Sequence, residues 1–174
     1  FNMGVEWDQI VRRVPAIFRM GDILYPSLAL ETLRIFQGAS AYKVTMAGAT
    51  GETSFGGKTG LVGIKAGLLE IPTDAFGRIW LYDTGHRKER FIPAWEVLSN
   101  DGLLREMEEK VLFIGSSAIA LKDLRATPRN PRASGVEIQA QLVEQMFLGD
   151  FLERPDWAAG LEFTFITLLG LLLI

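Results

Sequence analysis

The spacing of apolar residues predicts a helix in the first quarter of the chain. It is expected over 26–38, where Pro26-Ser27 supplies a start signal and Gly38 a stop signal. Its apolar residues recur at helical spacing, at Leu30, Leu33 and Phe36. We expect this helix to pack one face on a core.

A second helix is predicted over 135–149, where Gly149 supplies the stop signal. Its expected core-facing residues are Val136, Ala140, Val143 and Phe147. Ser134 and Glu137 have the spacing of a capping box, in which each side chain bonds the other residue's backbone amide. Gln141 lies one turn beyond Glu137, on the same face.

Between these helices, short apolar runs predict strands. The strands are expected at 10–14, 42–46, 61–64, 67–71, 78–83 and 111–115, the last as a continuous buried run. Two short helical pieces are expected at 93–98 and 102–110, with a break at Asn100-Asp101-Gly102. Strands mixed with helices predict an α/β fold, a single-domain mixed-sheet α/β sandwich with flanking helices.

The C-terminal segment is strongly apolar. From Phe163 to Ile174 there is no charged residue, and Pro155-Asp156-Trp157 before it indicates a helix start with an interfacial tryptophan. The run lacks a polar face, but it is shorter than the about 20 residues that cross a bilayer. We therefore expect one domain over 1–157 and the truncated start of a transmembrane helix over 158–174, with a buried core helix as the alternative.

Composition narrows the chemistry. The chain has 174 residues, a formal net charge of -3 and no cysteine, so disulfides, thiolate nucleophiles and cysteine-ligated metals are excluded. The mild negative charge gives no general reason to expect a nucleic acid partner. No recognisable ligand spacing joins the carboxylates to His86, so neither a metal nor a cofactor is expected.

One glycine-rich stretch, GETSFGGKTG at 51–60, resembles the end of a phosphate-binding loop. The spacing does not fit, because the position five residues before Gly57 is Glu52, an acidic residue that would repel phosphate. We interpret this stretch as a hairpin loop.

A second candidate is a serine nucleophile at Ser116 or Ser117. In the pattern G-x-S-x-G, Ser117 would be the nucleophile, but Ile119 stands where the second glycine belongs. The chain's one histidine, His86, would have to supply the base across the fold. We interpret His86 instead as a solvated loop residue beside Arg87 and Lys88, and keep a membrane-tethered serine hydrolase as an alternative.

The stretch 116–133 is longer than most loops in compact domains. Four basic residues and Asp123 lie between Lys122 and Arg132, which gives a local charge of +3 in a negative chain. The charge is explained either by solvation or by an anionic ligand, lipid headgroups or a carboxylate-bearing partner.

Several segments together resemble the CHASE2 domain, an extracytoplasmic sensory module of bacterial membrane receptors. The most specific match is KVLFIGSSAIALKD followed by TP and then SGVEIQAQLVEQMFLGDFLERP. YPSLAL and IPTDAFGRIWLYD resemble two earlier family segments. The resemblance covers about 1–157.

The chain departs from the family pattern at a few positions. The family's Asp-x-Asp-Gly turn is here Glu6-Trp7-Asp8-Gln9, without its glycine. Gln139 and Gln141 replace a more frequent histidine and asparagine, and Ser134 replaces a common proline. Any ligand contact made at these positions would be particular to this chain.

The resemblance implies a non-catalytic sensor outside the cell membrane. It would relay an unknown small-molecule or protein stimulus through its C-terminal helix to a cytoplasmic output domain, most often a nucleotide cyclase and otherwise a kinase, within a homodimeric receptor. A ligand-free dimerisation or partner-docking module is the alternative. The expected ligand-binding residues are Asp123, Arg125, Thr127, Glu137 and Gln141.

Overall fold

The computed structural model describes residues 6–47, 60–116, 123–153 and 157–173, and it has an α/β fold. The helices are α1 (Leu28–Phe36), α2 (Ala94–Ser99), α3 (Asp101–Glu106), α4 (Gly135–Leu148) and α5 (Ala158–Leu172), with a short 3-10 turn at Lys88–Arg90. The strands are β1 (Arg13–Pro15), β2 (Ile17–Met20), β3 (Ile23–Pro26), β4 (Tyr42–Met46), β5 (Leu61–Ala66), β6 (Leu69–Pro72), β7 (Arg78–Trp80), β8 (Leu124–Arg125) and β9 (Ala133–Ser134).

The strands form four small sheets, each antiparallel within the described residues. β4, β5 and β6 form a three-stranded sheet, while β1 pairs with β7, β2 with β3 and β8 with β9. One parallel contact, a bridge between Ile10 and Ala126, joins the N-terminal segment to the β8–β9 region. The expectation of a single mixed sheet is therefore wrong, because the described strands form four separate sheets. The α/β class is confirmed.

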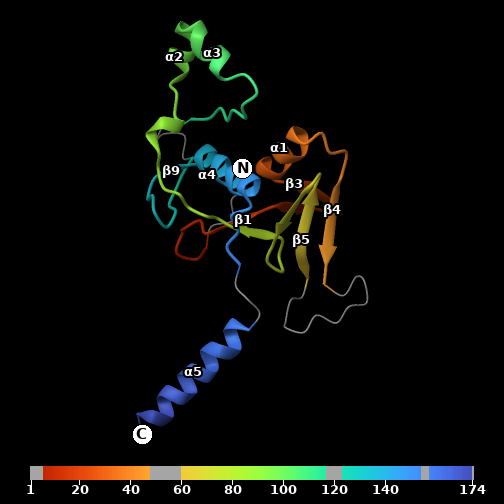
Figure 1. Ribbon diagram of the computed structural model, residues 1–174, viewed down its shortest axis with the longest axis vertical. Coiled ribbons are helices and arrows are strands. Elements are labelled where there is room, and N and C mark those ends of the chain that lie inside the picture. Colours follow the sequence, from red (N-terminus) through yellow and green to blue (C-terminus); the bar gives the residue numbers. More distant parts are fainter. Residues whose placement is uncertain (1–5, 48–59, 117–122, 154–156, 174) are drawn as a thin grey trace.

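The core lies where α1 and α4 pack on each other and on the strands (Figure 1). Its largest fully buried side chains include Leu30 and Leu33 of α1, Ile64 and Ile71 of the three-stranded sheet, Ile79 of β7, and Ile138, Leu142 and Met146 of α4. Burying a side chain of this size contributes roughly 1.5–3 kcal/mol. By contrast, α2, α3 and α5 lie away from this body in Figure 1.

Local sequence signals set the ends of α1 and α4 as expected. Ser27 accepts a hydrogen bond from the Leu30 amide at 3.2 Å and caps α1, and Ser134 accepts one from the Glu137 amide at 3.3 Å and caps α4. Gly149 ends α4 with a φ of 72°, in the left-handed region that favours glycine.

The buried face of α4 differs from the expected one. Val136 and Ala140 are half-buried and Phe147 is exposed, while Val143 is buried as expected. The face that packs on the core is centred on Ile138, Leu142 and Met146. The apolar pattern misplaced this face because several polar residues of α4 are buried too.

The apolar run at 111–115 is not a strand. Val111 and Phe113 are half-buried, whereas Leu112 and Ile114 are exposed, so the side chains alternate as in an extended chain. No described backbone pairs with this run in a sheet. An apolar run alone does not supply the neighbouring strand that a sheet requires.

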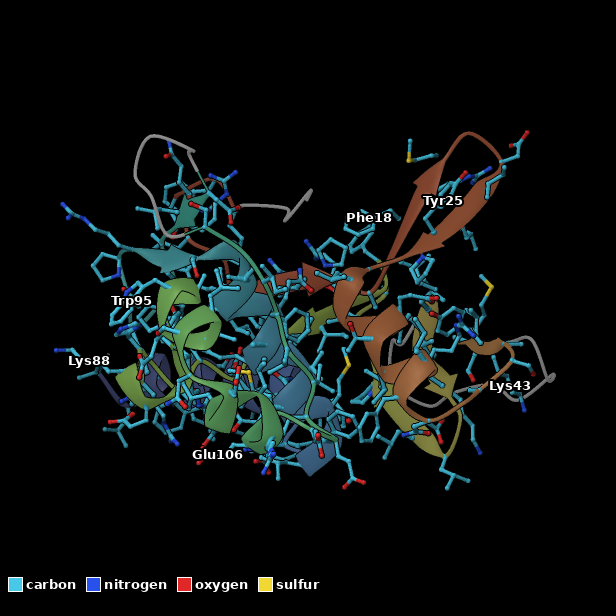
Figure 2. The ribbon with its side chains drawn as sticks, turned by 90° about the horizontal axis from the view of Figure 1, so that it is seen from above. Phe18, Tyr25, Lys43, Lys88, Trp95 and Glu106 are labelled. Carbon is cyan, nitrogen blue, oxygen red and sulfur yellow. The ribbon has the colours of Figure 1, made fainter. Side chains whose placement is uncertain are left out.

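Residues 17–26 form a hairpin that the sequence analysis did not predict. Gly21, with a φ of 61°, lies in the turn between β2 and β3, and Phe18 faces Tyr25 across the pair. Figure 2 shows the hairpin projecting from the rest of the chain. Its turn carries Gly-Asp between two apolar runs, a recognised hairpin signal.

The apolar C-terminal segment forms α5, a helix of 15 residues with largely exposed leucine, isoleucine and phenylalanine side chains. Within the described residues, no helix has both the length and the apolar character required to cross a membrane. The expected start of a transmembrane helix over 158–174 is therefore not confirmed.

Residues 6–9 form the turn in which the resembling family has a glycine and this chain has Gln9. Gln9 has a φ of 64°, and its side chain is exposed. The Gln9 amide bonds the Glu6 carbonyl at 2.8 Å, and the Ile10 amide bonds Asp8 Oδ1 at 3.1 Å. The turn thus holds a non-glycine residue in a conformation that costs about 1–2 kcal/mol.

We predict that Gln9→Gly raises the free energy of unfolding by about 1 kcal/mol, because glycine adopts the left-handed conformation without steric cost. Denaturant unfolding measures the change. Gln9→Ala is the control and should give no such gain, since alanine keeps the Cβ atom. Equal stability of the glycine and alanine variants would contradict the prediction.

Candidate functional site

Three polar residues of α4 lie on one stripe that faces residues 80–90. Glu137, Gln141 and Gln145 follow one another at intervals of four, which places them on one side of a helix. All three are buried. Beyond β7 the facing segment leaves the sheet and is irregular up to the short 3-10 turn. We call this contact the α4–loop interface.

The side chain of Gln145 makes two hydrogen bonds to the backbone of this segment, which a neighbouring strand would otherwise make. Its Nε2 atom donates to the Trp80 carbonyl at 2.8 Å, and its Oε1 atom accepts from the Tyr82 amide at 2.8 Å. A side-chain amide presents the same donor and acceptor as a peptide unit. Two backbone groups just past the end of β7 are satisfied in this way.

Gln141 makes only one such hydrogen bond to the backbone of this segment. Its Nε2 atom donates to the Gly85 carbonyl at 3.2 Å. Its Oε1 atom is buried without a hydrogen-bond partner, and the residue is only 5% exposed. Buried acceptors are nearly always paired, so this oxygen is an exception.

Glu137 contacts the chain's single histidine. His86 Nδ1 lies 2.9 Å from Glu137 Oε1, and the glutamate side chain is 6% exposed against 45% for the histidine. The His86 ring also lies 4.7 Å from the Phe91 ring. His86 is thus an exposed loop residue, as interpreted, but it also pairs with Glu137 across the fold. The capping box is confirmed on its serine side only, because the described partner of the Glu137 carboxylate is His86.

The other three expected site residues lie in or beside the β8–β9 region, and Asp123 contacts the start of α4. The Asp123 carbonyl accepts from the Gly135 amide at 3.0 Å, and a Cβ on Gly135 would lie 2.6 Å from Asp123 Oδ1, so a larger residue there would displace the Asp123 carboxylate. Arg125 lies in β8 opposite Ala133. Thr127, which is 6% exposed, closes a turn with Asn130 through bonds of 2.8 to 3.1 Å.

Asp83 links the two regions, since its carboxylate accepts from the Gly85 amide at 2.9 Å and the Arg129 amide at 2.8 Å. The structure therefore brings Glu137 and Gln141 together with His86, and places Asp123, Arg125 and Thr127 in a neighbouring scaffold. Sequence reasoning missed His86, Gln145 and Asp83. Of these, only Gln145 carried a signal, as the third member of the four-residue spacing.

The catalytic alternatives fall mostly on residues outside the described ranges. Ser117 and residues 51–59 of the glycine-rich stretch are not described, while Ser116 is half-buried. Among the described residues, no group of three histidine or acidic side chains could hold a metal ion.

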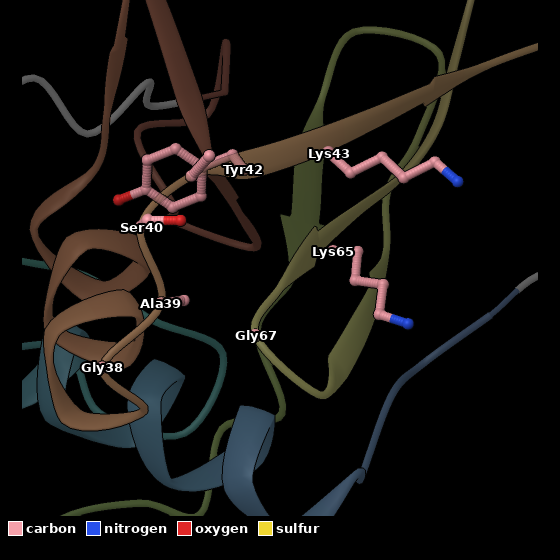
Figure 3. Close-up of a pocket in the computed structure, with 8 residues that line it drawn as sticks. Gly38, Ala39, Ser40, Tyr42, Lys43, Lys65 and Gly67 are labelled. Atoms are coloured by element: carbon pink, nitrogen blue, oxygen red, sulfur yellow. The ribbon is translucent and has the colours of Figure 1, made fainter.

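A separate hollow lies between the end of α1 and the three-stranded sheet (Figure 3). It has a volume of about 430 Å³, is open to solvent and is lined by Gly38, Ala39, Ser40, Ala41, Tyr42, Lys43, Lys65 and Gly67. Lys43 and Lys65 are cross-strand partners and extend the same way. Two exposed like charges attract anions only weakly, because water screens them.

At the edge of this hollow, Tyr42 bonds Glu31 of α1, which also pairs with Arg34 at 2.5 Å. The Arg34 guanidinium, with the Tyr42 hydroxyl, lowers the pKa of Glu31 to about 2, and burial together with Glu31 raises the pKa of Tyr42 to about 12. Tyr42 thus stays protonated as a donor, and this trio fixes β4 against α1.

We predict that Gln145→Leu lowers the free energy of unfolding by about 1–3 kcal/mol, because the Trp80 carbonyl and the Tyr82 amide lose their partners. Hydrogen exchange of the Tyr82 amide should accelerate as well. The matched control is Glu144→Gln, which removes the exposed pair with Arg90 at 2.6 Å and should cost less than about 1 kcal/mol. Unchanged exchange at Tyr82 would show that Gln145 does not hold this segment.

One comparison with known proteins identifies the chain. The family model described as CHASE2 domain matches residues 1–174. No curated protein and no solved structure matches. Because the family match spans the whole sequence, the chain belongs to the CHASE2 family of extracytoplasmic sensory domains.

Proposed function

We propose that this chain is the sensory part of a bacterial transmembrane signalling protein, and that it relays a stimulus from the α4–loop interface through α4 to α5. The observation that carries the proposal is the position of α4. Its buried polar stripe contacts residues 80–90, and the chain continues from its capped end toward α5. A stimulus that changes these contacts acts directly on α4, the helix that precedes α5.

The contacts are suited to a two-state element. A ligand shifts a conformational equilibrium only when it binds the two states with different free energies. The α4–loop interface consists of a few directional hydrogen bonds, each of which is either made or broken. A ligand that competes for one of them therefore discriminates between the closed and the opened interface.

The output expected for this receptor is a nucleotide cyclase on the cytoplasmic side, with α5 as part of the connection to the membrane. The exposed apolar side chains of α5 support this placement. They would be costly in water and are favoured in a lipid environment. Residues before α5 would then lie outside the cell membrane.

We predict that Leu98→Cys in the intact receptor reacts with a membrane-impermeant thiol reagent in whole spheroplasts. These 174 residues contain no other cysteine and Leu98 is 86% exposed, so labelling above that of the unsubstituted receptor reports the location of this site. Labelling only after lysis would overturn the location.

In the same cells, Gln145→Leu should change cyclic nucleotide production relative to Glu144→Gln, because it loosens α4. Equal output from both variants would overturn the relay.

A second function, a dimerisation surface, is favoured by the β2–β3 hairpin. Met20, Ile23 and Leu24 are each more than half exposed, and Tyr25 is nearly so. Figure 2 shows that this apolar hairpin projects away from the core. Exposed apolar groups on a projecting element are typical of protein contact surfaces.

For this second function we predict that the full chain is dimeric in detergent and that the double variant Ile23→Ser, Leu24→Ser weakens the dimer at least about tenfold, as expected from loss of buried apolar area. Light scattering measures the mass. Leu68→Ser, at a site 91% exposed in the β5–β6 turn, is the control. A monomeric wild type would exclude this function for the chain alone.

A further inference from the structure

The N-terminal half of the α4–loop interface has more acceptors than donors. The Glu137 carboxylate can accept several hydrogen bonds, and its described partner is one atom, His86 Nδ1. Gln141 Oε1 accepts none, and the orientation of this amide is set by the bond from Nε2 to the Gly85 carbonyl. One turn of α4 thus presents a carboxylate with one described partner and an amide oxygen with none.

Among the described residues, no lysine or arginine forms an ion pair with Glu137. Glu137 is nearly fully buried, and a buried carboxylate is costly without a counter-charge. Two nearby charged groups are engaged elsewhere, while the Arg129 guanidinium lies beside Gly85. Arg90 pairs with Glu144, and Asp83 accepts from the backbone of Gly85 and Arg129. Among the described ion pairs, His86 is the partner of Glu137, and it supplies charge only when protonated.

His86 is held in place loosely. Its ring is 45% exposed and contacts Phe91 on one side, so it covers Glu137 from the solvent side. The ring can leave Glu137 without giving up a large buried surface, and its departure opens the carboxylate to solvent. A cationic ligand can therefore displace the His86 ring from the Glu137 carboxylate.

We propose that Glu137 and Gln141 form a binding site for a protonated amine, at a position that His86 occupies in the structure. An ammonium group carries three N–H donors and one positive charge, which match the two acceptors and the buried carboxylate. Binding displaces His86 and breaks its contact with Glu137, while the bond from Gln141 Nε2 to the Gly85 carbonyl remains. The consequence for signalling rests on the proposed function, whereas the binding itself does not.

The first test uses the full chain in detergent, with methylammonium as the probe. The single histidine gives one imidazole C2 proton signal, and the expected result is a saturable shift of that signal as His86 leaves Glu137. Tetramethylammonium has the charge without the N–H donors and should shift it far less. An equal response to both ions, or no saturable response to methylammonium, would overturn the site.

Variants then locate the binding. Loss of a charge-assisted hydrogen bond predicts that Glu137→Gln binds methylammonium at least about tenfold more weakly. Glu144→Gln, on the same helix, should bind as the wild type does. His86→Ala should bind more tightly, because the competing group is gone, and imidazole at a pH of about 6, where most of it is protonated, should stabilise this variant. Equal affinity in the wild type and Glu137→Gln would overturn the proposal.

Should Glu137→Gln fail to fold, Gln141→Leu removes the unpaired acceptor and keeps the carboxylate, and the same direction of change is expected. The outcome also separates this inference from the proposed function. Amine binding that leaves cyclic nucleotide output unchanged would overturn the relay and keep the site. An output that responds to Gln145→Leu in a chain that binds no amine would overturn the site and keep the relay.

Discussion

The need to satisfy buried backbone groups next to α4 is the constraint on which the structure depends. Past Leu81, whose amide still bonds the Arg12 carbonyl, the chain leaves the β1–β7 pair and runs beside α4 without a described neighbouring strand. Unpaired peptide groups in such a place cost roughly 1–3 kcal/mol each. Gln145 and Gln141 supply the partners. The buried glutamines of α4 therefore do for this irregular segment what a strand would do in a continuous sheet.

The same device operates on the other side of α4. Gln139, which is 4% exposed, accepts from the Ala29 amide at 3.1 Å, in the first turn of α1. That amide belongs to the helix start, where no carbonyl of the helix itself is within reach. α4 is thus bonded to α1 on one flank and to residues 80–90 on another, while Leu142 and Met146 fill the core between them. A change at α4 reaches both neighbours.

Sequence reasoning predicted what local signals determine. The limits of α1 and α4 follow from Ser27, Ser134 and Gly149, which act within one turn of their own position. Pairing over long separations could not be predicted in this way. His86 meets Glu137 across 51 positions and Tyr82 meets Gln145 across 63, so no pattern along the chain relates them. The run at 111–115 failed as a strand for the same reason, because its expected partner is a matter of tertiary structure.

Gln145 is the point at which the two proposals meet. Its side chain holds Trp80 and Tyr82, and its backbone carbonyl accepts from Gly149 and, at 3.1 Å, from Asp150, where the chain leaves α4. The helix has 14 residues and is about 21 Å long. Loss of the His86–Glu137 contact at one end leaves Gln145 bonded at the other. The helix would then tilt about Gln145, and the direction in which the chain leaves toward α5 would change with it.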